Sequence, residues 1–287
     1  MRFLLIGLLL IVGLNSPWVI DPGVANGTLQ ITGEAIELKY AYAFQCDNAE
    51  GMLDGPELRI LVSDRELPDD VIAGWNGSMR LQPMVREGRV RGILLKIDPA
   101  RPTASLNGTL LFPPSSPMES LLLFTSTGNN EIRKLQIANN RVVGEAQYEM
   151  KPGEGQEMPA FKFSFSFGAP LFHDQEVTAR LTGASAARSA PTQSLLAFEK
   201  AVRENNLVLA RTLITEAKWH EIEAHRAQVG DATFKQFVRQ MIPPSAQRVR
   251  QVRQVIIRRS RAVIILNDGS GKIAMGLAQA DGKWKVD

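Results

Sequence analysis

The chemical feature that stands out in this sequence is a basic segment between Asp231 and Asp268. Residues 232–267, 36 in all, include eight lysines and arginines and no acidic residue. Six of the eight are the arginines Arg248, Arg250, Arg253, Arg258, Arg259 and Arg261. On a strand, Arg248 and Arg250 share one face, and part of this charge then forms a patch for an anionic glycan, a lipid head group or a protein. The alternative is a solvated sheet face whose charge is balanced by glutamates on neighbouring helices.

His220 and His225 are the nearest approach to a metal-binding motif. A zinc-binding helix places its two histidines four residues apart, on one face. A spacing of five rotates the second side chain by about 140° around a helix. We therefore predict exposed helix residues here rather than zinc ligands.

Nucleotide-binding and nucleophile motifs are incomplete. The Gly-Ser-Gly-Lys run at 269–272 has Leu266 where a phosphate-binding loop has its first glycine, and Ile273 where that loop has Ser or Thr. The chain contains no Gly-x-Ser-x-Gly elbow. We predict a hairpin turn at 269–272.

Four acidic residues follow a predicted strand, at Asp64, Glu66, Asp69 and Asp70. Paired carboxylates of this kind can bind calcium or serve in acid/base chemistry. Their irregular spacing around Pro68 favours a solvated turn instead. The sequence thus predicts no catalytic residue, no metal site and no cofactor.

The composition is that of a globular protein. Of the 287 residues, 44% are hydrophobic and 22% are charged, and the length is sufficient for two domains. The net charge of +3 is too small to indicate nucleic acid. Aromatic residues are also not interleaved with the arginines, so we predict no nucleic-acid partner.

The N-terminus predicts export from a bacterial cell. Met1-Arg2 precedes an apolar run from Phe3 to Leu14, which is too short to span a bilayer. Gly23 and Ala25 fit the positions that a signal peptidase reads, so residues 1–25 are predicted to be a signal peptide and the protein to be periplasmic or secreted. An uncleaved N-terminal membrane anchor is the alternative.

The single cysteine, Cys46, excludes an internal disulfide framework. No histidine or second cysteine lies near it in the sequence, so we expect a small buried residue at the end of a strand rather than a reactive thiol. Stability must therefore come from packed cores.

Residues 26–185 have the pattern of an all-β domain, a sandwich or an open barrel. Phe161, Phe163, Phe165 and Phe167 alternate with polar residues, as on a half-buried strand. Other predicted strands cover residues 36–44, 58–63, 89–97, 104–112, 134–138 and 141–150. One helical turn is expected near 69–75, and no longer helix before residue 186.

The C-terminal third predicts helices followed by an antiparallel sheet. Residues 186–192 are predicted to be a linker, because the segment is small, polar and ends at a proline. Beyond it, residues 193–287 begin with a helical stripe formed by Leu195, Phe198 and Val202, continued by Leu209 and Leu213. A helix capped by Asp231 follows, with the apolar residues Phe234, Phe237, Val238 and Met241. Extended runs from residue 248 onward then form hairpins.

This C-terminal part resembles the nuclear-transport-factor-2-like superfamily. The resemblance rests on the opening helix at 194–204, the turn at Asn205-Asn206 and the ending Gly-Lys-Trp-Lys-Val-Asp at 282–287. It implies an α+β cone in which helices close a curved antiparallel sheet, with Trp284 in the core, and it implies a homodimer through that sheet. No catalytic motif of the family matches, and His220, His225 and Asp231 are the nearest ionisable residues.

The first domain is similar to all-β modules of uncharacterised secreted bacterial proteins, through residues 59–68 and 143–145. Together these features predict a non-catalytic envelope protein that binds or scaffolds an envelope protein, a glycan or an anionic lipid. The alternative hypothesis is an enzyme or small-ligand binder that uses the interior of the C-terminal cone.

Overall fold

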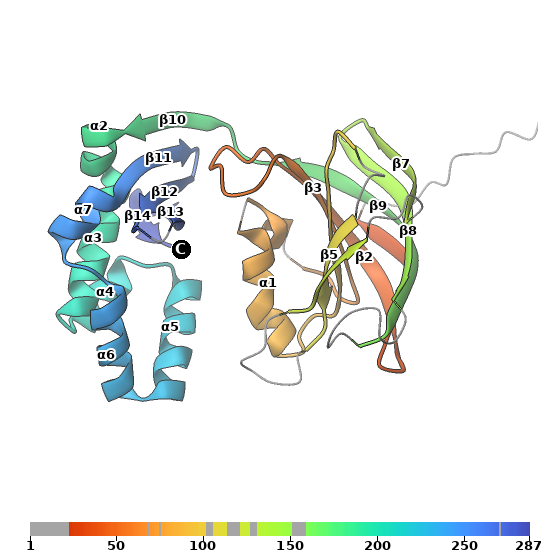
Figure 1. Ribbon diagram of the computed structural model, residues 1–287, viewed down its shortest axis with the longest axis horizontal. Coiled ribbons are helices and arrows are strands. Elements are labelled where there is room, and N and C mark those ends of the chain that lie inside the picture. The colour runs from red at the N-terminus through yellow and green to blue at the C-terminus, as the bar shows by residue number, and fades with distance from the viewer. Residues whose placement is uncertain are drawn as a thin grey trace, which may run out of the picture. The chain divides into compact units, whose positions relative to one another are not determined.

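The computed structural model describes residues 23–67, 69–74, 76–101, 106–113, 121–126, 131–150, 159–269 and 271–287. The chain divides into two compact units (Figure 1). The first consists of the chain up to Ala43 with Arg59–Ile72 and Met79–Phe172, and the second consists of Phe44–Leu58, Ala73–Ser78 and His173–Asp287. The predicted signal peptide lies outside the described residues up to residue 22, while Val24 and Ala25 already belong to a strand.

One nine-stranded sheet, in the order β6-β5-β4-β3-β2-β1-β9-β8-β7, dominates the first unit. Its strands are β1 (Val24–Ile31), β2 (Glu34–Cys46), β3 (Glu57–Ser63), β4 (Gly92–Ile97), β5 (Leu106–Leu111), β6 (Leu123–Ser126), β7 (Ile132–Ala138), β8 (Arg141–Met150) and β9 (Phe161–His173). The helical elements η1 (Asp69–Ile72) and α1 (Gly77–Arg86) follow β3. A single sheet replaces the two packed sheets of a sandwich.

The sheet is strongly curved around an aromatic core. The ring of Phe124, on β6 at one end of the strand order, stacks on Tyr148 of β8, next to the other end, with centroids 5.4 Å apart. Phe161 and Phe163 of β9 also contact the Phe124 ring. The alternating phenylalanines of β9 are all buried, as predicted, because successive side chains on a strand point to opposite faces.

Three elements of this unit were not predicted. β1 lies where the sequence places the signal cleavage site, and β6 has only four residues. α1 was not predicted from apolar periodicity because it has only ten residues and contains Pro83. Its residues Leu81 and Val85 are nevertheless fully buried. The predicted helical turn near 69–75 is confirmed as η1.

The second unit contains a five-stranded antiparallel sheet in the order β10-β11-β12-β13-β14. Its strands are β10 (Val177–Thr182), β11 (Val252–Arg258), β12 (Arg261–Asn267), β13 (Lys272–Ala280) and β14 (Lys283–Val286). Between β10 and β11 the chain forms α2 (Gly183–Arg188), α3 (Ala190–Arg203), α4 (Leu207–Thr212), α5 (Glu216–Val229), α6 (Asp231–Met241) and α7 (Ser245–Gln251). This mixed α and β composition agrees with the predicted class.

The helices cover one face of this sheet (Figure 1). Phe198, Trp219 and Phe234 pack there against strand residues such as Val255 and Ile264. Neighbouring strand residues on the opposite face, among them Ile256 and Val263, are buried as well. β12 is therefore buried along both faces, which explains its unbroken apolar sequence.

The boundaries within this part differ from those predicted. Residues 186–192 are not a linker, because α2 and α3 run through them and Ala186 and Thr192 are fully buried. The small side chains of this segment indicated a linker, whereas in the structure their size allows close packing. β10, predicted to be within the first domain, is an edge strand of the second sheet.

The apolar stripe predicted to run from α3 into α4 does not continue on the same residues. Asn205 has a positive φ of 56°, which resets the direction of the chain, so that Ala210 is buried on α4 and Leu209 is exposed. The residue that caps α6 is Gly230 rather than Asp231, whose carboxylate instead pairs with Arg226.

Gly108 on β5 is a test of how tightly the aromatic core packs. It lies directly opposite Phe124, and a Cβ atom at this position would lie 2.2 Å from the Phe124 ring. We expect Gly108→Ala to lower the free energy of unfolding by about 2 kcal/mol through overpacking, measured by urea denaturation. Gly55→Ala is the control, because no atom lies within 4 Å of the Cβ it would add. Equal stability of the two variants would contradict this packing.

Candidate functional site

The outer surface of the large sheet carries an open groove of about 690 Å³. It lies across three adjacent strands, β1, β9 and β8, and reaches the residue before β7. Its lining consists of Thr28, Gln30, Glu131, Gln147, Tyr148, Glu149, Lys162, Phe163 and Ser164. The volume falls within the range of small-molecule sites in proteins.

The strand register arranges the polar side chains of this groove in two parallel rows. In one row, Lys162 pairs with Gln30 on one side and Glu149 on the other. In the second row, Ser164 lies between Thr28 and Gln147. Lys162 and Ser164 are two residues apart and therefore share a face, so the rows are separated by about 7 Å along the strand.

The two rows present polar side chains, and the lining carries two carboxylates and one ammonium group. One row offers only hydroxyl and amide groups, which both donate and accept hydrogen bonds. The other adds an ammonium group beside a carboxylate, and Glu131, which accepts a hydrogen bond from Ser126, adds a second carboxylate. This combination can hydrogen-bond a neutral polar ligand, whereas a polyanion would meet an excess of negative charge.

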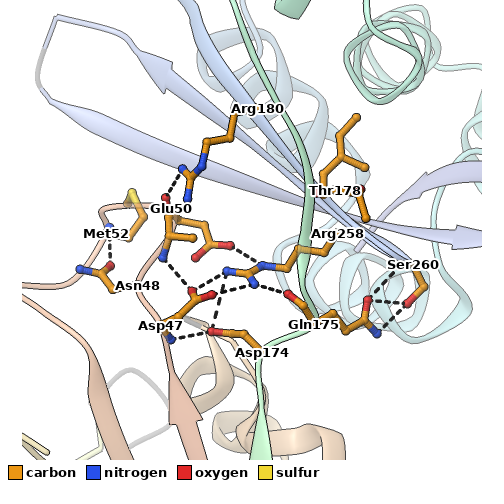
Figure 2. A network of polar contacts seen from close by, with 12 residues as sticks. Asp47, Asn48, Glu50, Met52, Asp174, Gln175, Thr178, Arg180, Arg258 and Ser260 are labelled. Atoms are coloured by element: carbon orange, nitrogen blue, oxygen red, sulfur yellow. Dashed lines mark hydrogen bonds and ion pairs between the residues drawn. The ribbon is translucent and has the colours of Figure 1, made fainter.

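A second polar cluster surrounds Arg258 in the second unit. Its guanidinium Nη2 and Nη1 donate to Asp47 over 2.6 and 3.0 Å, and Nε donates to Glu50 over 3.0 Å. Nη1 also donates to the carbonyl oxygen of Gln175. Figure 2 shows the guanidinium between these groups, with Asp174 3.8 Å from Nη2. The Arg258 side chain is only 5% exposed.

The same network orders the chain on either side. The backbone N–H of Asp47 donates to Asp174 over 2.9 Å, and Arg180 of β10 donates to the carbonyl oxygen of Ala49 (Figure 2). Asn48 accepts from the backbone of Leu53, which closes the loop after β2 on itself. These contacts place residues 47–53 against β10 and β11.

Burial and hydrogen bonding shift the pKa values of this cluster in opposite directions. Burial lowers the pKa of Arg258, but the hydrogen bonds to Asp47 and Glu50 outweigh it, and the net pKa is raised. For Asp47, burial raises the pKa, but the bonds from Arg258 and from the Ala49 N–H outweigh it, so the pKa is lowered. Burial raises the pKa of Asp174, which lies farther from the guanidinium and is less exposed than Asp47.

The structure corrects the predicted arginine patch. Arg248 lies on α7, not on a strand, and its buried guanidinium binds the buried carboxylate of Glu199 over 2.6 Å. Arg258 is the centre of the network above. Of the six arginines, Arg250, Arg253 and Arg259 are exposed and Arg261 is half-buried. A continuous surface of six arginines does not form, because two of them neutralise internal carboxylates.

The ionisable residues nearest the expected cone interior lie on the helix surface instead. His220 is exposed on α5, near Glu216 and Glu223. His225 packs edge-on against Phe237, with ring centroids 5.7 Å apart. Asp231 is exposed and bound by Arg226. None of the three is buried between the helices and the sheet.

In the acidic cluster after β3, Asp64 has a structural role and Glu66 is exposed, while the side chains of Asp69 and Asp70 lie outside the described part of the structure. The backbone N–H and Nε of Arg91 donate to the Asp64 carboxylate over 2.9 and 3.0 Å. Arg91 also pairs with Glu34. In the part of the chain that the structure describes, no set of three or more His, Cys, Asp or Glu residues is arranged to hold a metal ion. Cys46 is a buried thiol at the last position of β2, as predicted.

Among the helices of the described segments, none combines the length and the apolar character needed to cross a membrane. Comparison of the chain with family models, with curated proteins and with solved structures found no match.

Sequence reasoning missed both polar clusters. The groove depends on the cross-strand register, which joins residues 28, 147 and 164 from distant parts of the chain. The only available signal was the polar alternation of β9, in which Lys162 and Ser164 point away from the phenylalanines. Arg258 had no local signal, because its partners lie up to 211 residues away in the sequence.

Replacement of Arg258 tests whether the buried network is structural. We expect Arg258→Gln to lower the free energy of unfolding by about 3 kcal/mol, because it leaves buried carboxylates without their cation. Arg259→Gln, the exposed neighbour, is the control and should change stability by no more than about 0.5 kcal/mol. Urea unfolding followed by the fluorescence of Trp219 and Trp284 measures both. Similar losses for the two variants would refute the role of Arg258.

The shifted carboxylates predict a pH dependence. The folded state holds a proton on Asp174 at pH values where the unfolded chain has released it, so ionisation of Asp174 reduces stability as the pH rises above 3.8. Asp47, with a lowered pKa, contributes stability above pH 3.8 that is lost as the pH falls through its folded pKa.

We therefore expect Asp174→Asn to become more stable relative to the unmodified protein as the pH is raised from 4 towards 7. The measurement is a series of urea unfolding curves across this pH range. Glu176→Gln, at an exposed position two residues away, is the control. A stability difference for Asp174→Asn that stays constant with pH would contradict the assignment.

Proposed function

We propose that this protein is a non-catalytic, exported bacterial envelope protein, and that it binds a neutral, hydroxyl-rich ligand, a glycan, in the outer groove of its large sheet. The observation that carries the proposal is the pair of polar rows, Gln30–Lys162–Glu149 and Thr28–Ser164–Gln147. Such rows offer donors and acceptors at regular spacing on a rigid sheet, which suits a ligand with many hydroxyl groups.

Charge favours a neutral glycan over an anionic lipid as the ligand of this groove. An anionic lipid or polyanion would bring negative charge next to Glu131 and Glu149, with Lys162 as the single cation of the lining. An apolar ligand would leave the polar groups without partners, which costs binding free energy. A neutral polyol avoids repulsion by the carboxylates and provides hydrogen-bond partners for the polar groups.

The alternative, an enzyme or small-ligand binder that uses a C-terminal cone, has less support. Its space would lie between the helices and the sheet, where Phe198, Trp219 and Phe234 pack. The ionisable residues expected to act there, His220, His225 and Asp231, are exposed. The proposal includes an N-terminal export signal. It also includes an open barrel for the first unit and a nuclear-transport-factor-2-like fold for the second.

The groove is tested by titration with neutral linear oligosaccharides of glucose and of N-acetylglucosamine, using isothermal calorimetry. We expect saturable binding that Gln147→Ala weakens by about tenfold, because an amide loses its hydrogen bonds to the ligand. Gln136→Ala, an exposed glutamine on β7 outside the groove, is the matched control and should bind like the unmodified protein.

The absence of binding to every neutral oligosaccharide would overturn the glycan assignment. Binding that is equally weakened by Gln136→Ala and Gln147→Ala would place the ligand elsewhere. Both variants change exposed side chains, so we expect both to fold normally. Circular dichroism and thermal unfolding check this directly.

A further inference from the structure

The first strand of the large sheet begins inside the predicted cleavage site. β1 starts at Val24, and Val24 and Ala25 both pair with β9 on one side. Gly23, directly before the strand, donates its N–H to the carbonyl oxygen of Gly168 over 2.9 Å. The carbonyl oxygen of Gly23 accepts from the N–H of Ala41 on β2 over 3.0 Å. All three residues are therefore bonded into the sheet between two neighbouring strands.

This end of β1 lies in a buried part of the unit. Ala25 is 4% exposed, and its partner Phe167 and the β2 residue Ala41 are fully buried. Cleavage after Ala25 would take Gly23 away from the N–H of Ala41 and the carbonyl oxygen of Gly168. A buried backbone group that loses its hydrogen-bond partner costs folding free energy. Folding therefore favours a chain that keeps all three residues.

The sequence has no alternative peptidase site before this strand. A signal peptidase reads small residues at two positions that are separated by one residue. Between Phe3 and Thr28, only the pair Gly23 and Ala25 and the pair Ala25 and Gly27 have this spacing. A cut after either pair would remove part of β1. Removal of the N-terminal segment by this enzyme is therefore coupled to damage of the sheet.

The segment before β1 has the composition of a membrane anchor. Residues 3–20, 18 in all, are predominantly apolar and contain no charged residue. This length reaches the minimum for a membrane-spanning segment, whereas the run from Phe3 to Leu14 alone does not. Arg2 precedes the segment, and a basic residue on that side favours a cytoplasmic N-terminus with the following chain outside.

We propose that the exported protein keeps both residues 23–25 and the leader, residues 1–22, and that the leader anchors it in the membrane. The inference rests on the proposed export of the chain. Val24 and Gln30 are six residues apart on β1, so the anchor joins the sheet about 20 Å from the Gln30 row of the groove. Attachment at this end of β1 keeps the anchor away from that row.

Expression of the full chain in a bacterium, with a C-terminal tag, tests the anchor. We expect the protein in the membrane fraction, where it should resist extraction by salt and alkaline carbonate and be released by detergent. Its intact mass should include the leader and residues 23–25. Protease added to spheroplasts should remove the tag, because the chain that follows the anchor lies outside the cytoplasm.

Two variants separate the anchor from the strand. Ala25→Val removes the small residue that a peptidase would read and keeps a residue that favours strands, so the mass and the location should not change. The double variant Trp18→Ala with Ile20→Ala creates a pair of small residues directly before Asp21. It should release a soluble protein that begins at Asp21 and keeps all of β1.

A soluble exported protein that begins at Asn26 or Thr28 would overturn the anchor but not the proposed export. A shift of the N-terminus in Ala25→Val would do the same, because the peptidase would then read Ala25. A double variant that is cut before Asp21 but stays in the membrane would also overturn the anchor, since another segment would then attach the chain. A tag that protease reaches only after cell lysis would overturn the export itself.

Discussion

The buried guanidinium of Arg258 is the interaction on which the second unit depends. It joins β11 to Asp47 and Glu50, which are 211 and 208 residues away in the chain. Closing so long a loop has an entropic cost that local structure cannot offset. The buried guanidinium favours this closure, because without Asp47 and Glu50 it would keep only the Gln175 carbonyl oxygen and the more distant Asp174 as partners. The carbonyl oxygen of Gln175 completes the site before β10 begins.

Arg248 repeats this arrangement on the other side of the same unit. Its guanidinium binds the buried Glu199 of α3 and so fixes α7 against the helical layer. The basic segment therefore has two roles that the sequence does not distinguish. Arg248 and Arg258 neutralise internal carboxylates, whereas Arg250, Arg253 and Arg259 are exposed.

The first unit obtains both its core and its groove from one physical rule, the alternation of side chains along a strand. Phe161 and Phe163 of β9 enter the curved interior and contact Phe124, while Lys162 and Ser164 face outward between β1 and β8. A rigid aromatic interior keeps the polar rows at constant spacing. The groove therefore originates in the register of the sheet.

The sequence by itself determined the local elements. Alternating runs and turn residues predicted seven strands of the large sheet, apolar spacing predicted the buried face of α3, and turn residues predicted the final hairpins. These signals are local, since each depends on residues within one or two turns or along one strand. The short β6 and the proline-containing α1 were too brief to produce such a signal, and Asn205 shifted the phase of α4 so that Leu209 became exposed.

Tertiary structure alone decided which residues can act together. Cross-strand register brought Thr28, Gln147 and Ser164 into one row, and burial separated Arg258 from the exposed Arg259 beside it. The second unit also recruits Phe44–Leu58 and Ala73–Ser78 from within the first half of the chain. The physical reason is that burial and long-range pairing depend on all the segments that pack together, whereas a sequence pattern records only the preference of each segment alone.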